Sequence, residues 1–142
     1  MMGWILRIED LQKSIENPTW EEVYRYLKSL DGKNVTAVYL ESKDGFLMAG
    51  GGEVIKGRTR YIVEYFNQGD NVIEEDSAIL INEDGNEDLQ DLVDEDEDFI
   101  HMNINQVGTD VFVGHLVEFP QVVSAFRHFY ETGRLSEDLS WE

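Results

Sequence analysis

The sequence predicts an α+β fold, in which one domain spans residues 1–142 and an antiparallel β-sheet packs with a helix from the N-terminal half and a C-terminal helix. Two segments carry apolar residues at helical spacing, and several shorter ones are rich in β-branched and aromatic residues. The connections between the strand segments are mostly short, which favours antiparallel neighbours. With 142 residues, 42% of them hydrophobic, the chain has the length and the apolar content of one folded domain.

The N-terminal half begins with a short predicted strand at residues 4–8. A helix is predicted to start after Thr19, because Glu22 stands three residues on and completes a capping box. Gly32 is placed to end that helix. Its buried face is predicted from one apolar stripe, made of Trp20, Val23, Tyr24, Leu27 and Leu30. Further strands are predicted at residues 35–41, 46–49 and 60–66.

The C-terminal half contains three more strand candidates and the second helix. The strands are predicted at residues 78–81, 99–106 and 111–117. In the middle one, Ile100, Met102 and Ile104 alternate with His101, Asn103 and Asn105, which indicates a strand with one buried face. The last helix is predicted to run from Pro120 to Gly133. Its apolar side consists of Val122, Val123, Phe126, Phe129 and Tyr130.

The charge balance restricts the function. The chain has 30 Asp and Glu against 11 Lys and Arg, a formal net charge of −19, which repels phosphate backbones and anionic lipids. We therefore expect no nucleic-acid or membrane partner, and a cationic protein partner instead. The absence of cysteine excludes disulfides and thiolate chemistry. No signal peptide or membrane span is recognisable, which predicts a cytoplasmic protein.

Most of the negative charge lies in one part of the chain. Residues 61–126 contain 17 acidic residues and no Lys or Arg, and residues 83–98 alone contain ten carboxylates. This acidic run, residues 83–98, is predicted to be an internal loop with its ends fixed by the strands on either side. Leu89, Leu92 and Val93 are spaced to anchor an apolar face of it. The run is either a solubilising loop or a tethered surface that attracts a basic partner.

No pattern for catalysis, a cofactor or a metal is found. The glycines at residues 50–52 lie between two predicted strands with no helix pattern after them, so they predict a turn or bulge rather than a phosphate loop. Asp94, Asp96 and Asp98 lack the glycine of a calcium loop, because Phe99 stands at its sixth position. The histidines lack ligand spacing and are predicted in structural or surface roles: His101 and His115 in strands, and His128 on the last helix.

Several motifs together resemble a known family. They are Thr19-Trp20-Glu21-Glu22 before a helix ending in Leu30-Asp31-Gly32, the glycine-rich residues 46–52 with the strand at 60–66, and a C-terminal helix closing in Phe129-Tyr130-Glu131-Thr132-Gly133, followed by Trp141-Glu142. In order and spacing this pattern resembles the first-numbered immunity-protein family of bacterial polymorphic-toxin systems. The resemblance implies a small, non-catalytic cytosolic protein that binds and neutralises a cognate secreted toxin domain, often a nucleic-acid-modifying enzyme such as a deaminase or nuclease. It assigns framework roles to Trp20, Phe126, Phe129 and Trp141, which are expected to be buried core residues.

The acidic run supplies the expected contact surface, because a toxin that acts on nucleic acid needs a cationic cleft that carboxylates can occupy. The candidate partner-binding residues are Asp91, Asp94, Glu95, Asp96, Glu97 and Asp98, with Glu74 and Glu75 nearby in sequence. The chain is expected to be a monomer or a weak homodimer. Two alternatives stay open: an acidic inhibitor or DNA mimic that binds a basic host nucleic-acid-binding protein, and a small enzyme that uses carboxylates alone.

Overall fold

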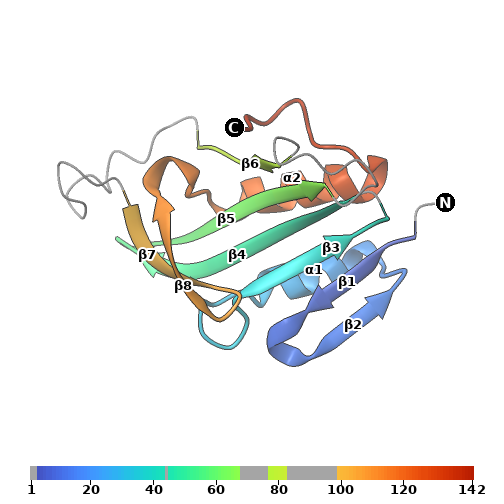
Figure 1. Cartoon of the computed structure of the whole chain (residues 1–142), viewed down its shortest axis with the longest axis horizontal. Coiled ribbons are helices and arrows are strands. Elements are labelled where there is room, and N and C mark those ends of the chain that lie inside the picture. The colour runs from blue at the N-terminus through green and yellow to red at the C-terminus, as the bar shows by residue number, and fades with distance from the viewer. Residues whose placement is uncertain (1–2, 44, 68–76, 83–98) are drawn as a thin grey trace.

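The structure, a computed structural model, describes residues 3–43, 45–67, 77–82 and 99–142 and has the α+β architecture (Figure 1). Its main sheet has six antiparallel strands in the order β2-β1-β3-β4-β5-β6, and β7 pairs with β8 in a separate hairpin. The elements are β1 (Ile5–Ile8), β2 (Lys13–Glu16), α1 (Trp20–Lys28), β3 (Ala37–Glu41), β4 (Gly45–Ile55), β5 (Arg58–Asn67), β6 (Ala78–Ile79), β7 (Phe99–Ile104), β8 (Val107–Phe112) and α2 (Phe119–Thr132), with 3₁₀ turns η1 (Glu9–Leu11) and η4 (Val113–His115).

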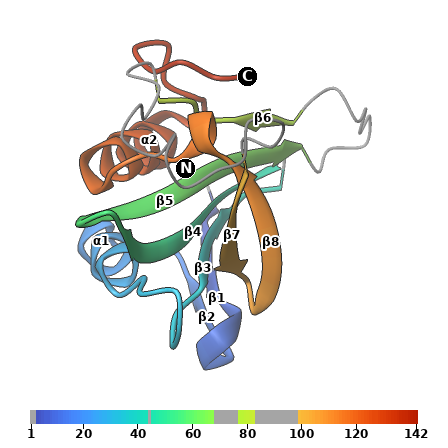
Figure 2. The same cartoon turned by 90° about the vertical axis from the view of Figure 1, so that its left-hand side faces the viewer.

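The elements form three layers (Figure 2). Both helices cover one face of the main sheet, and the β7–β8 hairpin covers the other face. Alternation along the strands supplies apolar side chains to both faces. The core under the helices includes Leu40, Leu47, Val63, Phe126 and Phe129, and the core under the hairpin includes Met48, Ile62, Met102, Val111 and Leu116. The hairpin is thus held on the sheet by a hydrophobic core of its own.

The predicted capping box of α1 is confirmed. The Thr19 hydroxyl accepts a hydrogen bond from the Glu22 N–H at 3.2 Å, and the Glu22 carboxylate accepts one from the Thr19 N–H at 3.0 Å. The predicted end at Gly32 is wrong, because the helix ends at Lys28. The Ser29 hydroxyl donates to the Tyr26 carbonyl at 2.6 Å, and the chain then enters a turn in which Gly32 has φ +72°.

The glycines at residues 50–52 do not separate two strands as predicted, because β4 continues through them alongside β5. The predicted bulge is confirmed by a register shift between Gly51 and Glu53. A Cβ atom on Gly50 would lie 2.9 Å from Ile104 of the hairpin, and one on Gly52 would lie 2.4 Å from the Leu30 carbonyl oxygen. Here β4 approaches the hairpin on one side and the turn after α1 on the other.

The strand predicted at residues 111–117 is placed wrongly. Asn105 and Gln106 both have positive φ, 50° and 67°, and form a two-residue hairpin turn, so β8 starts at Val107 and ends at Phe112. His115 accordingly lies in η4 and not in a strand. Strand β2 has no counterpart among the predictions. The strands predicted at residues 4–8, 35–41, 46–49, 60–66, 78–81 and 99–106 correspond to β1, β3, β4, β5, β6 and β7, with different ends.

The predicted core residues divide into two groups. Phe126 and Phe129 are fully buried, as expected. Trp20 and Trp141 are only half-buried and pack against the core from its edge. The Trp20 ring has the Arg127 guanidinium 4.9 Å from its centroid, and the Trp141 indole N–H donates to the Ser136 carbonyl at 2.9 Å. Each of these two tryptophans thus combines apolar packing against the core with a polar or cationic contact.

Asp31 organises the turn between α1 and β3. One of its oxygens accepts hydrogen bonds from the N–H groups of Val35, Lys33 and Asn34 at 3.0, 2.9 and 2.8 Å, and these bonds lower the pKa of Asp31 to about 2. Because this pKa lies below the unfolded value of 3.8, the stability from the ionised carboxylate is present above about pH 4. It is lost as the pH falls towards 2.

We therefore expect Asp31→Asn to lower the free energy of unfolding by about 1 kcal/mol at pH 7, and the difference from wild type to shrink as the pH falls from 4 to 2. Urea unfolding across this pH range measures it. Asp138→Asn removes an exposed carboxylate elsewhere and serves as the matched control. A difference for Asp31→Asn that is the same at pH 7 and pH 2 would contradict the assignment.

Candidate partner-binding surface

Every acidic residue predicted to contact a partner lies outside the described residues. The same holds for the apolar residues predicted to anchor the acidic run. The residues concerned are Glu74, Glu75, Asp91, Asp94, Glu95, Asp96, Glu97 and Asp98, and the anchors Leu89, Leu92 and Val93. The described residues on either side of these segments show where the segments join the fold.

The two ends of the acidic run join the fold at the same place. At one end, the Asn82 N–H donates a hydrogen bond to the Gly114 carbonyl at 2.9 Å. At the other end, Phe99 is paired with Phe112 in the β7–β8 register, and their ring centroids are 6.1 Å apart. The residues that flank the run are therefore both held against residues 112–114.

The segment that contains Glu74 and Glu75 joins the fold elsewhere. It lies between Asn67 at the end of β5 and Ser77 before β6, whereas the acidic run begins after Asn82, beyond β6. An extended stretch from Ser77 to Asn82 spans roughly 16 Å. Ser77 and Asn82, the attachment points of the two acidic segments on either side of β6, are therefore separated by this stretch.

Two exposed phenylalanines stand where the acidic run meets the hairpin, and we call Phe99 and Phe112 the aromatic end. Their exposed fractions are 52% and 37%, and their rings meet edge to face. The Phe112 ring also contacts the His115 ring, with centroids 5.1 Å apart. Gly114 makes room for it, because a Cβ there would lie 2.7 Å from the Phe112 ring. The aromatic end is thus a positioned apolar surface that faces solvent.

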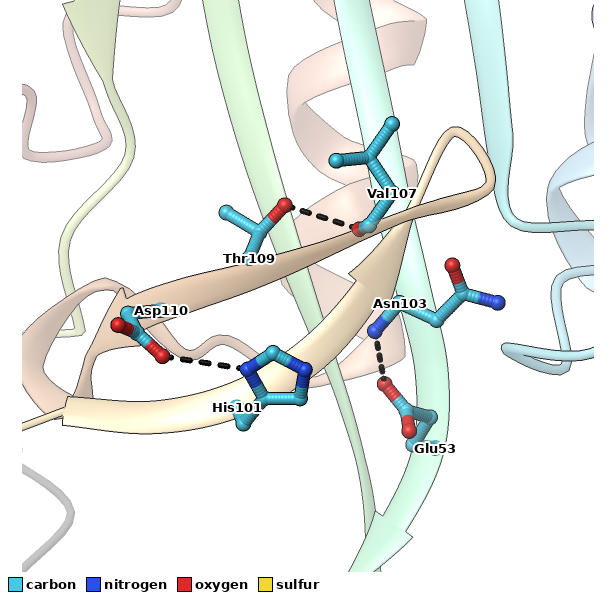
Figure 3. A network of polar contacts seen from close by, with 6 residues as sticks. All are labelled: Glu53, His101, Asn103, Val107, Thr109 and Asp110. Atoms are coloured by element: carbon cyan, nitrogen blue, oxygen red, sulfur yellow. Dashed lines mark hydrogen bonds and ion pairs between the residues drawn. The ribbon is translucent and has the colours of Figure 1, made fainter.

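An exposed polar pair lies next to the aromatic end on the same outer face of the hairpin. His101 Nδ1 is 3.2 Å from Asp110 Oδ1 (Figure 3), and both side chains are largely exposed. In the strand register, His101 and Asp110 form the next cross-strand pair on the same face as Phe99 and Phe112, two residues nearer the hairpin turn. The outer face therefore presents a carboxylate beside the aromatic rings.

A second carboxylate lies near the aromatic end through His115. The His115 Nε2 atom is 3.0 Å from an oxygen of the Glu142 side chain, which is 66% exposed. His115 also lies near Glu64 of β5. Burial raises the pKa of the Glu64 carboxyl, and the charge interaction with His115 partly offsets this rise. No group of three or more His, Asp or Glu side chains suited to a metal ion occurs among the described residues.

The hairpin is fixed to the sheet by polar contacts at two points. At the first point, the Asn103 N–H donates to the Glu53 carboxylate of β4 at 3.1 Å (Figure 3). Figure 3 also shows a contact within the hairpin, in which the Thr109 hydroxyl donates to the Val107 carbonyl at 3.0 Å. At the hairpin turn, the Gln106 N–H donates to the Thr36 hydroxyl at 2.9 Å.

The Asp10 carboxylate holds this second point together. It accepts hydrogen bonds from the Thr36 N–H at 2.9 Å, the Thr36 hydroxyl at 2.7 Å and the Gln106 amide at 3.3 Å. Burial by itself would raise the pKa of Asp10, but these bonds outweigh it and the pKa is lowered. These hydrogen bonds fix the hairpin turn on the main sheet, and with it the position of the hairpin's outer face.

Sequence reasoning missed the aromatic end, although one signal for it was present. Strict alternation in β7 puts Phe99 on the same face as His101, opposite the buried Met102. An aromatic residue on the polar face of a strand is a signal for an exposed contact. Phe112 could not be found in this way, because the limits predicted for its strand were wrong.

Comparisons with protein-family models, with curated proteins and with solved structures return no match to this chain. In the part of the chain that the structure describes, neither helix has both the length and the apolar character needed to cross a membrane.

Proposed function

We propose that this chain is a non-catalytic immunity protein that binds and neutralises a cognate secreted toxin domain with a basic surface, such as a deaminase or nuclease that acts on nucleic acid. The sequence motifs that resemble the immunity-protein family support the class. The net charge of −19 and the absence of any Lys or Arg from residues 61–126 support a basic partner.

One observation carries the proposal: both flanks of the acidic run are held against residues 112–114, beside the aromatic end. Protein interfaces combine a few well-packed aromatic anchors with charged surroundings that speed association and exclude wrong partners. A solubilising loop needs carboxylates only. A contact surface also needs apolar anchors, and the exposed rings of Phe99 and Phe112 next to the acidic run can serve as such anchors.

The proposal is tested by co-expressing the chain with the C-terminal domain of a large secreted protein encoded by a neighbouring gene. We expect the chain to abolish the toxicity of that domain and to form a complex with it whose Kd rises steeply with salt concentration. Cell survival and calorimetry at several salt concentrations give the two readouts. Neither protection nor a complex at low salt would contradict the proposal.

The charge distribution also supports a second candidate, an acidic inhibitor that binds a basic host nucleic-acid-binding protein in place of DNA. In that case the neighbouring secreted domain gives no complex, and the chain competes with duplex DNA for the host protein. A fluorescence-anisotropy competition assay with labelled DNA separates the two functions.

A further inference from the structure

We infer that the aromatic end is a receptor for a cationic side chain of the protein partner, and that it takes arginine in preference to lysine. The inference rests on the proposed function only in that the partner is basic. It names the chemistry of the contact and the residues that make it, Phe99 and Phe112 with the neighbouring Asp110.

The first support comes from the cations of this chain and where they lie. Several of its exposed or half-buried aromatic rings already carry a cation of their own. The Arg127 guanidinium lies 4.9 Å from the Trp20 centroid, that of Arg7 lies 5.0 Å from Tyr39, and the Lys28 ammonium lies 5.9 Å from Tyr24. Such contacts are favourable within about 6 Å of the ring.

The aromatic end differs from these rings. Among the described residues, no Lys or Arg lies over Phe99 or Phe112, and the sequence has no Lys or Arg between residues 61 and 126 to provide one. Yet 52% of Phe99 is exposed, so ring surface is open to a cation from outside. A guanidinium or ammonium group on these rings would therefore be supplied by a partner protein.

The second support is the charge around the rings. Asp110 lies in the next cross-strand pair on the same face, and its side chain is 75% exposed. Glu142 lies 3.0 Å from His115, whose ring contacts Phe112. A cation on the rings therefore has carboxylates nearby, and the ten acidic residues before Phe99 draw cationic partners to this place.

Arginine fits this arrangement better than lysine. Its planar guanidinium stacks on an aromatic face while its N–H groups donate to a carboxylate at the edge, and it is more weakly hydrated than an ammonium group. Asp110 lies in the cross-strand pair next to the two rings, and His101 contacts its Oδ1 atom, so one guanidinium can stack on a ring while it donates to Oδ2. Lysine can use either the ring or the carboxylate with its compact charge, and it keeps more of its hydration.

Two peptides of equal length and charge test this inference, one carrying arginines and the other lysines at the same positions between serines. Each is titrated into the full chain at low salt, and aromatic NMR shifts and calorimetry give the site and the Kd. We expect the arginine peptide to bind about two- to fivefold more tightly and to shift the ring signals of Phe99 and Phe112.

The variants separate the rings from the charge. The double variant Phe99→Leu, Phe112→Leu keeps apolar side chains and all carboxylates, so we expect both peptides to bind it equally. Tyr24→Leu is the matched control, because Tyr24 is also 37% exposed but already carries Lys28, and it should keep the preference for arginine. If the double variant has a lower Tm than wild type, Phe99→Leu alone replaces it.

Either of two results overturns the inference: wild type binds both peptides equally, or the preference for arginine survives loss of the rings. Neither result depends on the toxin experiment. A chain that neutralises its toxin but lacks the preference keeps the proposed function and loses this contact. A chain that prefers the arginine peptide but neutralises no toxin keeps the arginine contact and loses the proposed function.

Discussion

Replacing Gly52 by Ala is expected to lower the free energy of unfolding by about 4 kcal/mol or more. Gly52 has φ +86°, a conformation in which a side chain is strained. Its new Cβ would also lie 2.4 Å from the Leu30 carbonyl oxygen. That oxygen belongs to the backbone, so it cannot be moved away by rotating a side chain, and the turn after α1 has to shift.

Gly57→Ala is the matched control, because it imposes the strain without the clash. Gly57 has φ +76°, and a Cβ there would meet nothing within 4 Å. Its expected loss is about 1–2 kcal/mol, which is the penalty of the left-handed conformation alone. Urea unfolding of both variants measures the difference. Equal losses would show that β4 and the turn after α1 are not in the close contact described.

Under the proposed function, neutralising the carboxylates at residues 94–98 is expected to raise the Kd of the complex with the toxin domain by about 100-fold at low salt. Each exposed charge contributes on the order of 0.5 kcal/mol, and five acting on one basic surface add to this factor. Most of the loss should appear in the association rate, and the salt dependence should weaken. The changes are Asp94→Asn, Glu95→Gln, Asp96→Asn, Glu97→Gln and Asp98→Asn.

A variant with the same change in net charge but intact residues 94–98 controls for this effect. It carries amides in place of exposed carboxylates on other parts of the fold: Glu9, Glu16, Glu21, Glu137 and Asp138. Surface plasmon resonance with the toxin domain gives association and dissociation rates for both variants. If both variants lose the same amount of affinity for the toxin domain, the net charge determines binding and the position of the acidic run does not.

The helices were the part of the fold most open to prediction, because local chemistry sets their ends. The capping box at Thr19 and Glu22 needs only residues three apart, and Gly133 at the end of α2 adopts the positive φ expected of it. The end of α1 was mispredicted, because Ser29 and Asp31 stabilise an earlier stop with their own hydrogen bonds. Apolar spacing predicted which face of Trp20 points inward but not how deeply it is buried.

Strand limits and strand order depended on contacts that sequence spacing does not contain. β8 begins where it does because Asn105 and Gln106 form the hairpin turn, and neither residue is the glycine usually found at such a turn. The charge of the acidic run was plain in the sequence. The aromatic end was not, because it exists only once the register brings Phe112 opposite Phe99.

The attachment of residues 82 and 99 to the same short segment, residues 112–114, has a consequence for how this protein can change over evolutionary time. A stretch of chain between two neighbouring fixed points can be lengthened or rewritten at little expense in closure entropy, about 0.6 kcal/mol for each doubling of its length. Under the proposed function, a new partner specificity can therefore arise by replacement of residues 83–98 alone, while the sheet, both helices and the two hydrophobic cores keep their sequence.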